Sequence, residues 1–191
     1  MSNLPRLGKD DLNAEQNDLW DYILKGPRGA SLGESIKFLP GPFNPWMQIP
    51  SFGKLAAEMG ERLRFHSELS GKHRELAILT TGAHWKAEFE FWAHSQVARA
   101  EGLPESVINA LRVGTPVPYA DDQQRLVHVI SKDLVETGRT RADLTEQLAK
   151  AIGWPAVVEL VALVGFYCMV SFTLNAFEVE LPEGVSPIWP R

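Results

Sequence analysis

The chain has 191 residues, a length that suits one domain with a substantial hydrophobic core. Apolar residues make up 45% of it and charged residues 23%, as in ordinary soluble globular proteins. The formal net charge is −5, and the Lys and Arg residues are scattered. A broad nucleic-acid-binding surface is therefore excluded, because phosphates require clustered basic side chains. The single cysteine, Cys168, excludes an intrachain disulfide and a thiolate metal cluster built from one chain.

The N-terminal segment MSNLPRLGKDDLNAEQ is polar and lacks an apolar signal core, so we expect a cytoplasmic protein. The most apolar run, residues 154–177, is long enough to suggest a transmembrane helix. Two features argue against that interpretation: no basic residue flanks either end closely, and Glu159 within the run would be costly in lipid. We therefore interpret the run as a buried helix and expect no membrane contact.

The first helix is expected over residues 10–24, where apolar side chains recur near one face. Residues 25–50 then hold five prolines and four glycines, a density that predicts no helix. Their apolar side chains are nevertheless too numerous for a flexible linker. We expect an ordered proline-rich arm that packs over a neighbouring subunit or a pocket, with a loop packed on its own domain as the alternative. Trp46 is a candidate substrate-binding residue if the arm covers a pocket.

Helical patterns dominate after Pro50, and no stretch shows strand alternation flanked by hairpin turns. Ser51 and Thr140 are positioned to cap two of the expected helices. These helices are expected at residues 52–68, 72–84, 86–101, 104–114, 119–137, 141–153 and 154–177. We predict an all-α fold with one domain over residues 1–191, in which 1–50 form the N-terminal helix and arm and 51–191 the core.

In the stretch ELAILTTGAHWKAEFEFWAHSQVARAEG at 75–102, Glu75, His84, Glu90 and His94 are interleaved with large apolar residues. Glu90 and His94 are four residues apart and project from one helix face, which small alanines border. The short link after His84 predicts that the two helices pack as an antiparallel-like or sharply angled pair. Glu75 would then approach His94, and a carboxylate bonded to one imidazole nitrogen raises the basicity of the other.

Each of these residues also has an ordinary structural interpretation. Glu90 and His94 could be a solvated ion pair within one helix, and Glu75 could be a first-turn acid favoured by the helix dipole. His84 could cap carbonyl groups at a helix C-terminus. The spacing is not that of a metal site, so no metal is expected, and Cys168 is interpreted as an inert buried thiol. Spacing alone leaves the structural and functional interpretations open.

The run RELAIL at 74–79, followed by GAHWKAEFEFWAHSQVARAEGL at 82–103, resembles the carboxymuconolactone decarboxylase family, which shares its fold with alkylhydroperoxidase D. The shared pattern is an Arg-Glu pair that opens a helix, an aromatic-rich E-x-x-x-H segment and an A-x-x-x-G-L ending. The resemblance covers about residues 50–115. The upstream run LPGPFNPWMQIPSFGKLAAEMGERLRF also resembles the entry to longer members, whereas the C-terminal part matches only in being helical.

The peroxidase branch of this family carries an upstream Glu, a C-x-x-C pair and a His four residues after the second Cys. With His94 in register, Glu90 occupies the second cysteine position, Ala87 the first, and Glu75 the position of the acid. Peroxide reduction needs an attacking thiolate and a resolving thiol, so the resemblance implies that peroxidase chemistry is absent here. The decarboxylase branch commonly has an acid near the second cysteine position with a histidine following, which Glu90 and His94 fit.

The resemblance implies an all-helical, alkylhydroperoxidase D-like fold that assembles as a trimer or hexamer with pockets near subunit contacts. It also implies a lyase for a small carboxylated lactone or a related acid from the breakdown of aromatic compounds. In such an enzyme His94 would donate a proton or stabilise negative charge, Glu75 would orient His94, and Glu90 would be a second acid or base.

His84, Arg74 and Arg28 are further candidates for holding the acid substrate. We expect no organic cofactor, because the sequence has no Gly-rich phosphate loop. The alternative from a different class is a non-catalytic oligomeric protein that binds a ligand or acts as a scaffold.

Overall fold

The computed structural model describes residues 4–32 and 36–189, and in these ranges the regular structure is helical apart from one β-bridge between Gly8 and Phe38. The all-α prediction is confirmed. The chain divides into two compact units, one of residues 1–66 with 173–180 and the other of residues 67–172 with 181–191. That the two units act as a single domain stays a prediction.

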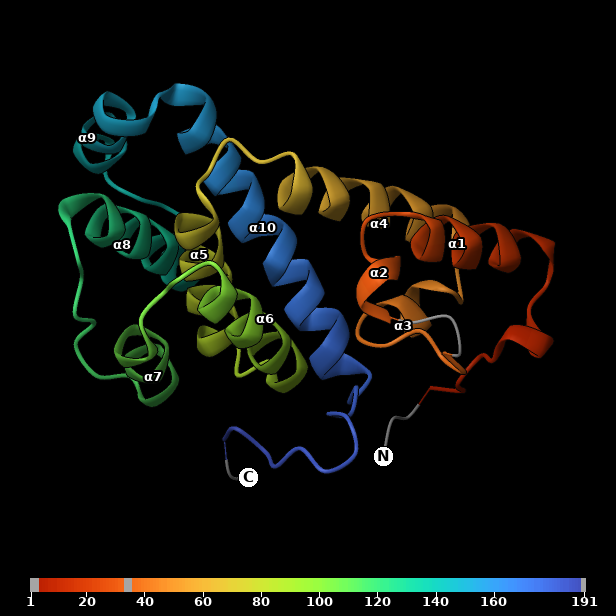
Figure 1. Cartoon of the computed structure of the whole chain (residues 1–191). Helices are drawn as coiled ribbons and strands as arrows, with labels where there is room; N and C mark the ends of the chain where they lie inside the picture. The colour runs from red at the N-terminus through yellow and green to blue at the C-terminus, as the bar shows by residue number, and fades with distance from the viewer. Residues whose placement is uncertain (1–3, 33–35, 190–191) are drawn as a thin grey trace. The chain divides into compact units, whose positions relative to one another are not determined.

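The first unit begins with a short 3-10 helix and continues with helices α1 to α4 (Figure 1). A capping box formed by Asn13 and Gln16 starts α1, four residues later than expected. The predicted cap Ser51 is wrong, because Pro50 already occupies the first turn of α4 and Ser51 lies inside the helix. The elements are η1 (Lys9–Asp11), α1 (Ala14–Lys25), α2 (Gly29–Leu32), α3 (Phe43–Trp46) and α4 (Pro50–Phe65).

The proline-rich arm contains two single-turn helices, α2 and α3, where none was predicted. Prolines are tolerated in a first turn, whose amide groups have no partner within the helix, so one turn can form despite their density. Leu39 and Met47 of the arm are buried in a core with side chains from α1 and α4. A Cβ on Gly53 of α4 would lie 2.7 Å from the carbonyl oxygen of Trp46, so the arm passes close against α4. The described arm therefore packs on its own unit; residues 33–35 lie outside the described ranges.

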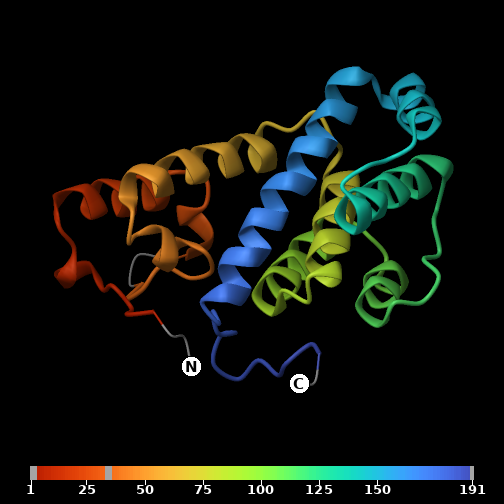
Figure 2. The same cartoon turned by 180° about the vertical axis from the view of Figure 1, so that it is seen from behind.

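Helix α5 is the central element of the second unit, and it contacts α6, α7 and α8. Figures 1 and 2 show α6 and α10 running beside it. Four consecutive residues, 76–79, are fully buried on α5, so the helix is covered on all sides at that level. The elements are α5 (Gly71–His84), α6 (Glu88–Ala100), α7 (Glu105–Val113), α8 (Asp122–Thr137), α9 (Ala142–Ile152) and α10 (Trp154–Ala176), of which α10 ends in the first unit.

Side-chain caps begin two of these helices. The Ser70 hydroxyl accepts a hydrogen bond from the His73 amide at the start of α5, and Asp121 accepts one from the Gln124 amide at the start of α8. The predicted cap Thr140 is wrong. Its hydroxyl donates to Asp133 of α8 instead, and α9 starts at Ala142 without a side-chain cap.

Helix α10 is long and apolar enough to cross a membrane by length and composition alone, and 56% of its most apolar 18-residue window is buried. A core helix of a soluble protein passes the same test. Its internal carboxylate, Glu159, accepts hydrogen bonds from the Ser67 hydroxyl and the Glu68 amide, which satisfies a charge that would have no partner in lipid.

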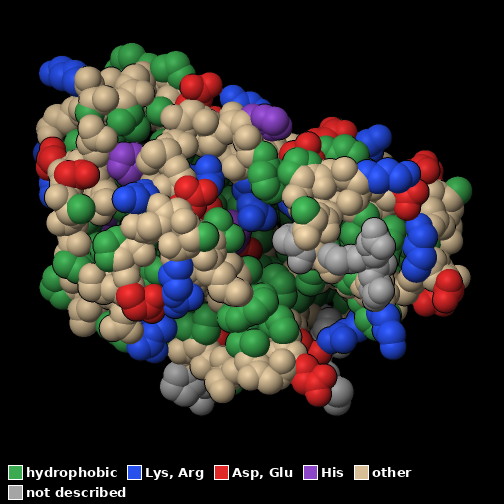
Figure 3. Space-filling view, in the orientation of Figure 1, with side chains coloured by type: hydrophobic (Ala, Val, Ile, Leu, Met, Phe, Trp, Pro, Cys, Tyr) green, Lys and Arg blue, Asp and Glu red, His purple; other side chains and the backbone are tan. Residues whose placement is uncertain are grey.

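On the face shown in Figure 3, Lys and Arg side chains are interspersed with Asp and Glu.

Replacing Ser70 tests its role as the N-terminal cap of α5. Ser70→Ala should lower the free energy of unfolding by about 1 kcal/mol, because the first turn of α5 loses the acceptor for one of its free amides. Ser106→Ala is the matched control, since Ser106 is also exposed in the first turn of a helix of this unit but makes no described side-chain hydrogen bond. Urea unfolding followed by circular dichroism measures both, and equal losses would contradict the assignment.

Candidate active site

The link between α5 and α6 decides which side chains of the two helices meet. Lys86 adopts a left-handed conformation with φ of 49°, and the Ala87 amide donates to the Gly82 carbonyl over 2.9 Å. This tight reversal brings α6 back alongside α5 (Figure 1). Glu75 lies nine residues before the end of α5, and His94 lies seven residues after Ala87. At a rise of about 1.5 Å per residue, both residues are at a similar distance from the link along their helices.

His94 lies between two carboxylates. Its Nδ1 is 2.6 Å from Oε2 of Glu75, and its Nε2 is 2.9 Å from Oε1 of Glu90. The three residues are 5%, 0% and 4% exposed, respectively. The three predicted catalytic residues therefore converge in a buried cluster, and the solvated-pair interpretation of Glu90 and His94 does not describe this geometry.

The two carboxylates contact His94 differently. The Glu75 carboxylate forms a hydrogen bond with Nδ1, whereas Oε1 of Glu90 is close to Nε2 without meeting the geometry of a hydrogen bond. Among the described residues, no other donor reaches that buried oxygen. Burial of an acceptor without a donor costs about 1–3 kcal/mol, so the ion pair with the imidazole at 2.9 Å is the interaction that offsets the burial of Glu90.

Tyr167 of α10 completes the cluster. Its hydroxyl lies 3.3 Å from Nε2 of His94, and its ring packs edge-on against the imidazole with centroids 5.1 Å apart. Sequence spacing does not predict this residue, because it lies 73 positions from His94. The one available signal was a hydroxyl-bearing aromatic within the apolar run GFYCMVSF.

Burial by itself lowers the pKa of His94, but the charges of Glu75 and Glu90, with the hydrogen bond to Glu75, outweigh it and raise the pKa to about 9. The imidazole is therefore protonated at neutral pH, so that both ring nitrogens carry protons. Nδ1–H donates to Glu75, and the proton on Nε2 faces Tyr167 and Glu90. The cluster thus holds a proton on Nε2 that the Tyr167 hydroxyl accepts over 3.3 Å and that also lies near Oε1 of Glu90.

Arg74, a candidate substrate-binding residue, contacts the cluster through Glu75. Its Nε donates to Oε1 of Glu75 over 3.1 Å, and an Nη donates to Glu101 over 3.1 Å. It therefore neutralises and orients Glu75 from the side opposite to His94. The charges of Arg74 and His94 together balance those of Glu75 and Glu90.

The remaining predicted residues lie elsewhere. His84 is exposed at the end of α5 and lines a separate cavity described below. Arg28 and Trp46 belong to the first unit, where Arg28 donates to the Ala57 carbonyl and Trp46 packs between Phe43 and Phe52.

The single thiol does not take part in the cluster. Cys168 is half-buried, accepts a hydrogen bond from Nε1 of Trp85 over 3.3 Å, and has a pKa raised by burial. It is therefore a protonated thiol at neutral pH. Within residues 4–32 and 36–189, no group of three or more His, Cys, Asp or Glu side chains could hold a metal ion.

No family model and no curated protein matches the chain. Among solved structures, it is similar to the alkylhydroperoxidase AhpD core of an uncharacterized peroxidase-related protein from Ralstonia eutropha JMP134. The two share a TM-score of 0.75 and 16% sequence identity over 95% of this chain and 93% of that one. The likeness confirms the predicted fold: the chain has an all-helical, AhpD-like fold, and with one cysteine it lacks a C-x-x-C pair.

Proposed function

We propose that the chain is a carboxy-lyase of the carboxymuconolactone decarboxylase type that acts on a small carboxylated lactone or a related acid from aromatic-compound breakdown. The observation that carries the proposal is the buried His94 imidazolium between Glu75 and Glu90, with Tyr167 at Nε2. A scaffold or simple binding protein would have no need to bury an imidazole between two carboxylates.

Decarboxylation breaks the carbon–carbon bond to the substrate carboxylate and releases carbon dioxide. The electron pair stays on the substrate as an enolate-like anion, and a proton must then reach carbon. His94 supplies that proton from Nε2, and Glu75 holds Nδ1–H so that the ring keeps its orientation. Solvent returns a proton to the ring before the next turnover.

Glu90 and Tyr167 act on the same edge of the imidazole. Oε1 of Glu90 is buried 2.9 Å from Nε2, so it can stabilise the imidazolium before transfer or receive a proton from an acidic substrate. The Tyr167 hydroxyl can donate to an enolate-like oxygen. Arg74 acts through Glu75 and is a positioning residue, because its guanidinium contacts the carboxylate rather than the imidazole.

A trimeric or hexameric assembly is part of the proposal. What supports it is the resemblance to the family and a row of exposed apolar side chains along α4, which would be covered in an oligomer. This row consists of Phe52, Leu55 and Met59.

Replacing His94 tests the assigned chemistry. In a screen of ring-cleavage lactone acids for carbon dioxide release, His94→Gln should lower turnover by about 10²-fold or more, because the proton donor is lost. Glu75→Gln should lower turnover by less, since Glu75 orients the ring rather than transferring the proton.

His94→Gln should also lower stability by about 1–3 kcal/mol, since two buried carboxylates lose their partner, so turnover must be compared per folded molecule. His66→Gln is the matched control, because His66 is exposed and lies in the other unit. A folded His94→Gln enzyme with unaltered turnover would show that the reaction does not take place at this cluster.

The raised pKa of His94 predicts a pH dependence of stability. In the unfolded chain the imidazole titrates near 6.5, whereas in the folded protein it titrates at about 9. The stabilisation is therefore complete below pH 6.5 and is lost as pH rises through about 9, by an amount on the order of 3 kcal/mol at about 1.4 kcal/mol per unit. Urea unfolding at a series of pH values, in parallel with His94→Gln, isolates this contribution. An NMR titration that places His94 near 6.5 would contradict it.

The chain should have no thiol-dependent peroxidase activity, although its structural neighbour is described as peroxidase-related. Ala87 and Glu90 stand where two thiols would be needed, and the Cys168 thiol is protonated. Hydroperoxide consumption with a dithiol reductant should equal the rate without protein. Robust turnover in the wild type that disappears in Cys168→Ser would contradict this expectation.

A further inference from the structure

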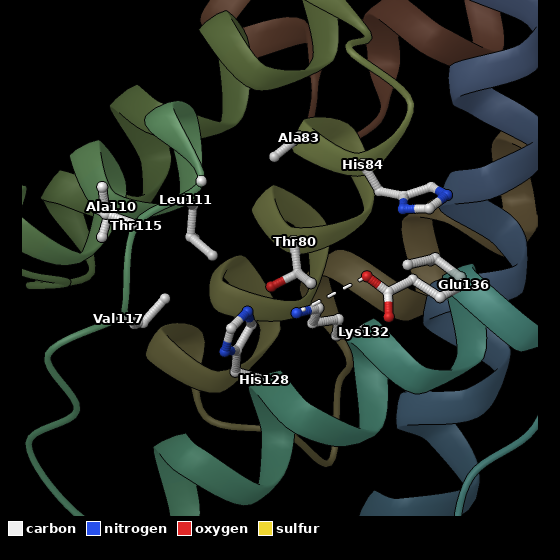
Figure 4. Close-up of a pocket in the computed structure, with 12 residues that line it drawn as sticks. Thr80, Ala83, His84, Ala110, Leu111, Thr115, Val117, His128, Lys132 and Glu136 are labelled. Carbon is white, nitrogen blue, oxygen red and sulfur yellow. Dashed lines mark ion pairs between the residues drawn. The ribbon is translucent and has the colours of Figure 1, made fainter.

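The second unit contains a cavity of about 210 Å³ that the proposed chemistry does not use. Its walls come from α5, the end of α7 with the following loop, and α8 (Figure 4). None of Glu75, Glu90, His94 or Tyr167 lines it. It opens to solvent beside Lys132 and Glu136, whose side chains are 55% and 45% exposed.

Polar side chains from α5 and α8 lie close together in the wall of the cavity. In Figure 4 the side chains of Thr80, His128 and Lys132 point toward one another, with Leu111 and Val117 on one side and His84 with Glu136 on the other. The Thr80 hydroxyl donates to the Leu76 carbonyl, which leaves its lone pairs free to accept.

His128 offers the cavity a fixed donor. The Tyr119 hydroxyl lies 2.7 Å from Nδ1 of His128. Burial, with a smaller contribution from the Lys132 charge, lowers the pKa of His128 to about 4, so its ring is neutral at neutral pH. When Tyr119 donates to Nδ1, the single ring proton resides on Nε2, and Nε2–H becomes a donor on the edge of the ring away from Tyr119.

Lys132 supplies the positive charge. Its Nζ lies 3.8 Å from Oε1 of Glu136, an ion pair too long for a hydrogen bond. Among the described residues Lys132 makes no hydrogen bond. Both partners are largely exposed, and such pairs contribute little, so a ligand anion can replace Glu136 at the ammonium group.

The rest of the wall is mainly apolar. Side chains from three helices and the loop after α7 form a surface against which a hydrocarbon body can pack: Ala83, Ala110, Leu111, Val117 and Val135. A cavity of about 150 Å³ is enough to hold benzene, so the present volume suits one ring or a short branched chain with a polar group. We propose that this cavity is a second binding site, separate from the Glu75–His94–Glu90 cluster, for a small monocarboxylic acid with an apolar body.

The charges select this class of ligand. The carboxylate would accept hydrogen bonds from the Lys132 ammonium and from Nε2–H of His128, and the apolar body would lie against Leu111 and Val117. A phosphate dianion would meet only one cation, because His128 is neutral. An organic cation beside Thr80 and His128 would be repelled by Lys132, which points toward both side chains.

Isothermal titration with benzoate tests the proposal on the full chain. We expect saturable binding with a dissociation constant on the order of 1 mM, and weaker binding of the neutral isostere benzamide. Lys132→Gln should weaken benzoate binding by about 10-fold or more, the usual scale for a charge-assisted hydrogen bond. Glu136→Gln should leave it unchanged or tighten it, because a competing carboxylate is removed. Lys150→Gln is the matched control, since it removes the same charge from an exposed site on α9 outside the cavity.

Ala83→Leu fills the cavity without a change of charge and should abolish binding. Glu90→Gln should leave benzoate binding intact, because Glu90 belongs to the other site. Absence of saturable binding, equal affinity for benzamide, or binding that survives both Lys132→Gln and Ala83→Leu would overturn the proposal. Loss of binding in Glu90→Gln alone would place the benzoate at the acid–base cluster and would overturn it as well.

Discussion

The contact on which the second unit depends is the buried ion pair between His94 and Glu75. Removing an imidazolium and a carboxylate from water is unfavourable, and it is tolerated only when charge and hydrogen bonds are matched closely. Here a 2.6 Å contact joins the two groups, and Arg74 bonds to the second oxygen of Glu75. The helices that carry these residues must therefore keep their mutual position, because a small shift would leave buried charges unpaired.

The same requirement explains why the backbone accepts strain between α5 and α6. Lys86, a residue with a Cβ, takes a left-handed conformation that glycine would adopt more easily. The resulting reversal aligns Glu75 with His94, and α10 adds Tyr167 from a third direction. The cluster is thus assembled from three helices, which restricts its geometry more than one amphipathic helix could.

Thiol chemistry and proton-transfer chemistry make opposite demands on the groups that surround a site. A reactive cysteine needs a neighbouring base that keeps it ionised, whereas an acid–base enzyme needs a proton held where a substrate can take it. With Glu90 four residues before His94, the imidazole gains a second negative neighbour and holds its proton more tightly. That electrostatic setting, more than the overall fold, supports the proposed lyase activity.

The sequence by itself determined the helical class and most helix positions, because apolar spacing and breaking residues act locally. It also determined that Glu90 and His94 share a face, since four residues make about one helical turn. It did not determine the helix caps, which were predicted at Ser51 and Thr140. Helix α4 instead starts at Pro50, and the Thr140 hydroxyl donates to Asp133 of α8. Only the tertiary structure decided that Tyr167 joins His94, that Arg74 bonds Glu75, and that His84 faces another cavity. These contacts depend on the packing of helices distant in the chain, which no local pattern encodes.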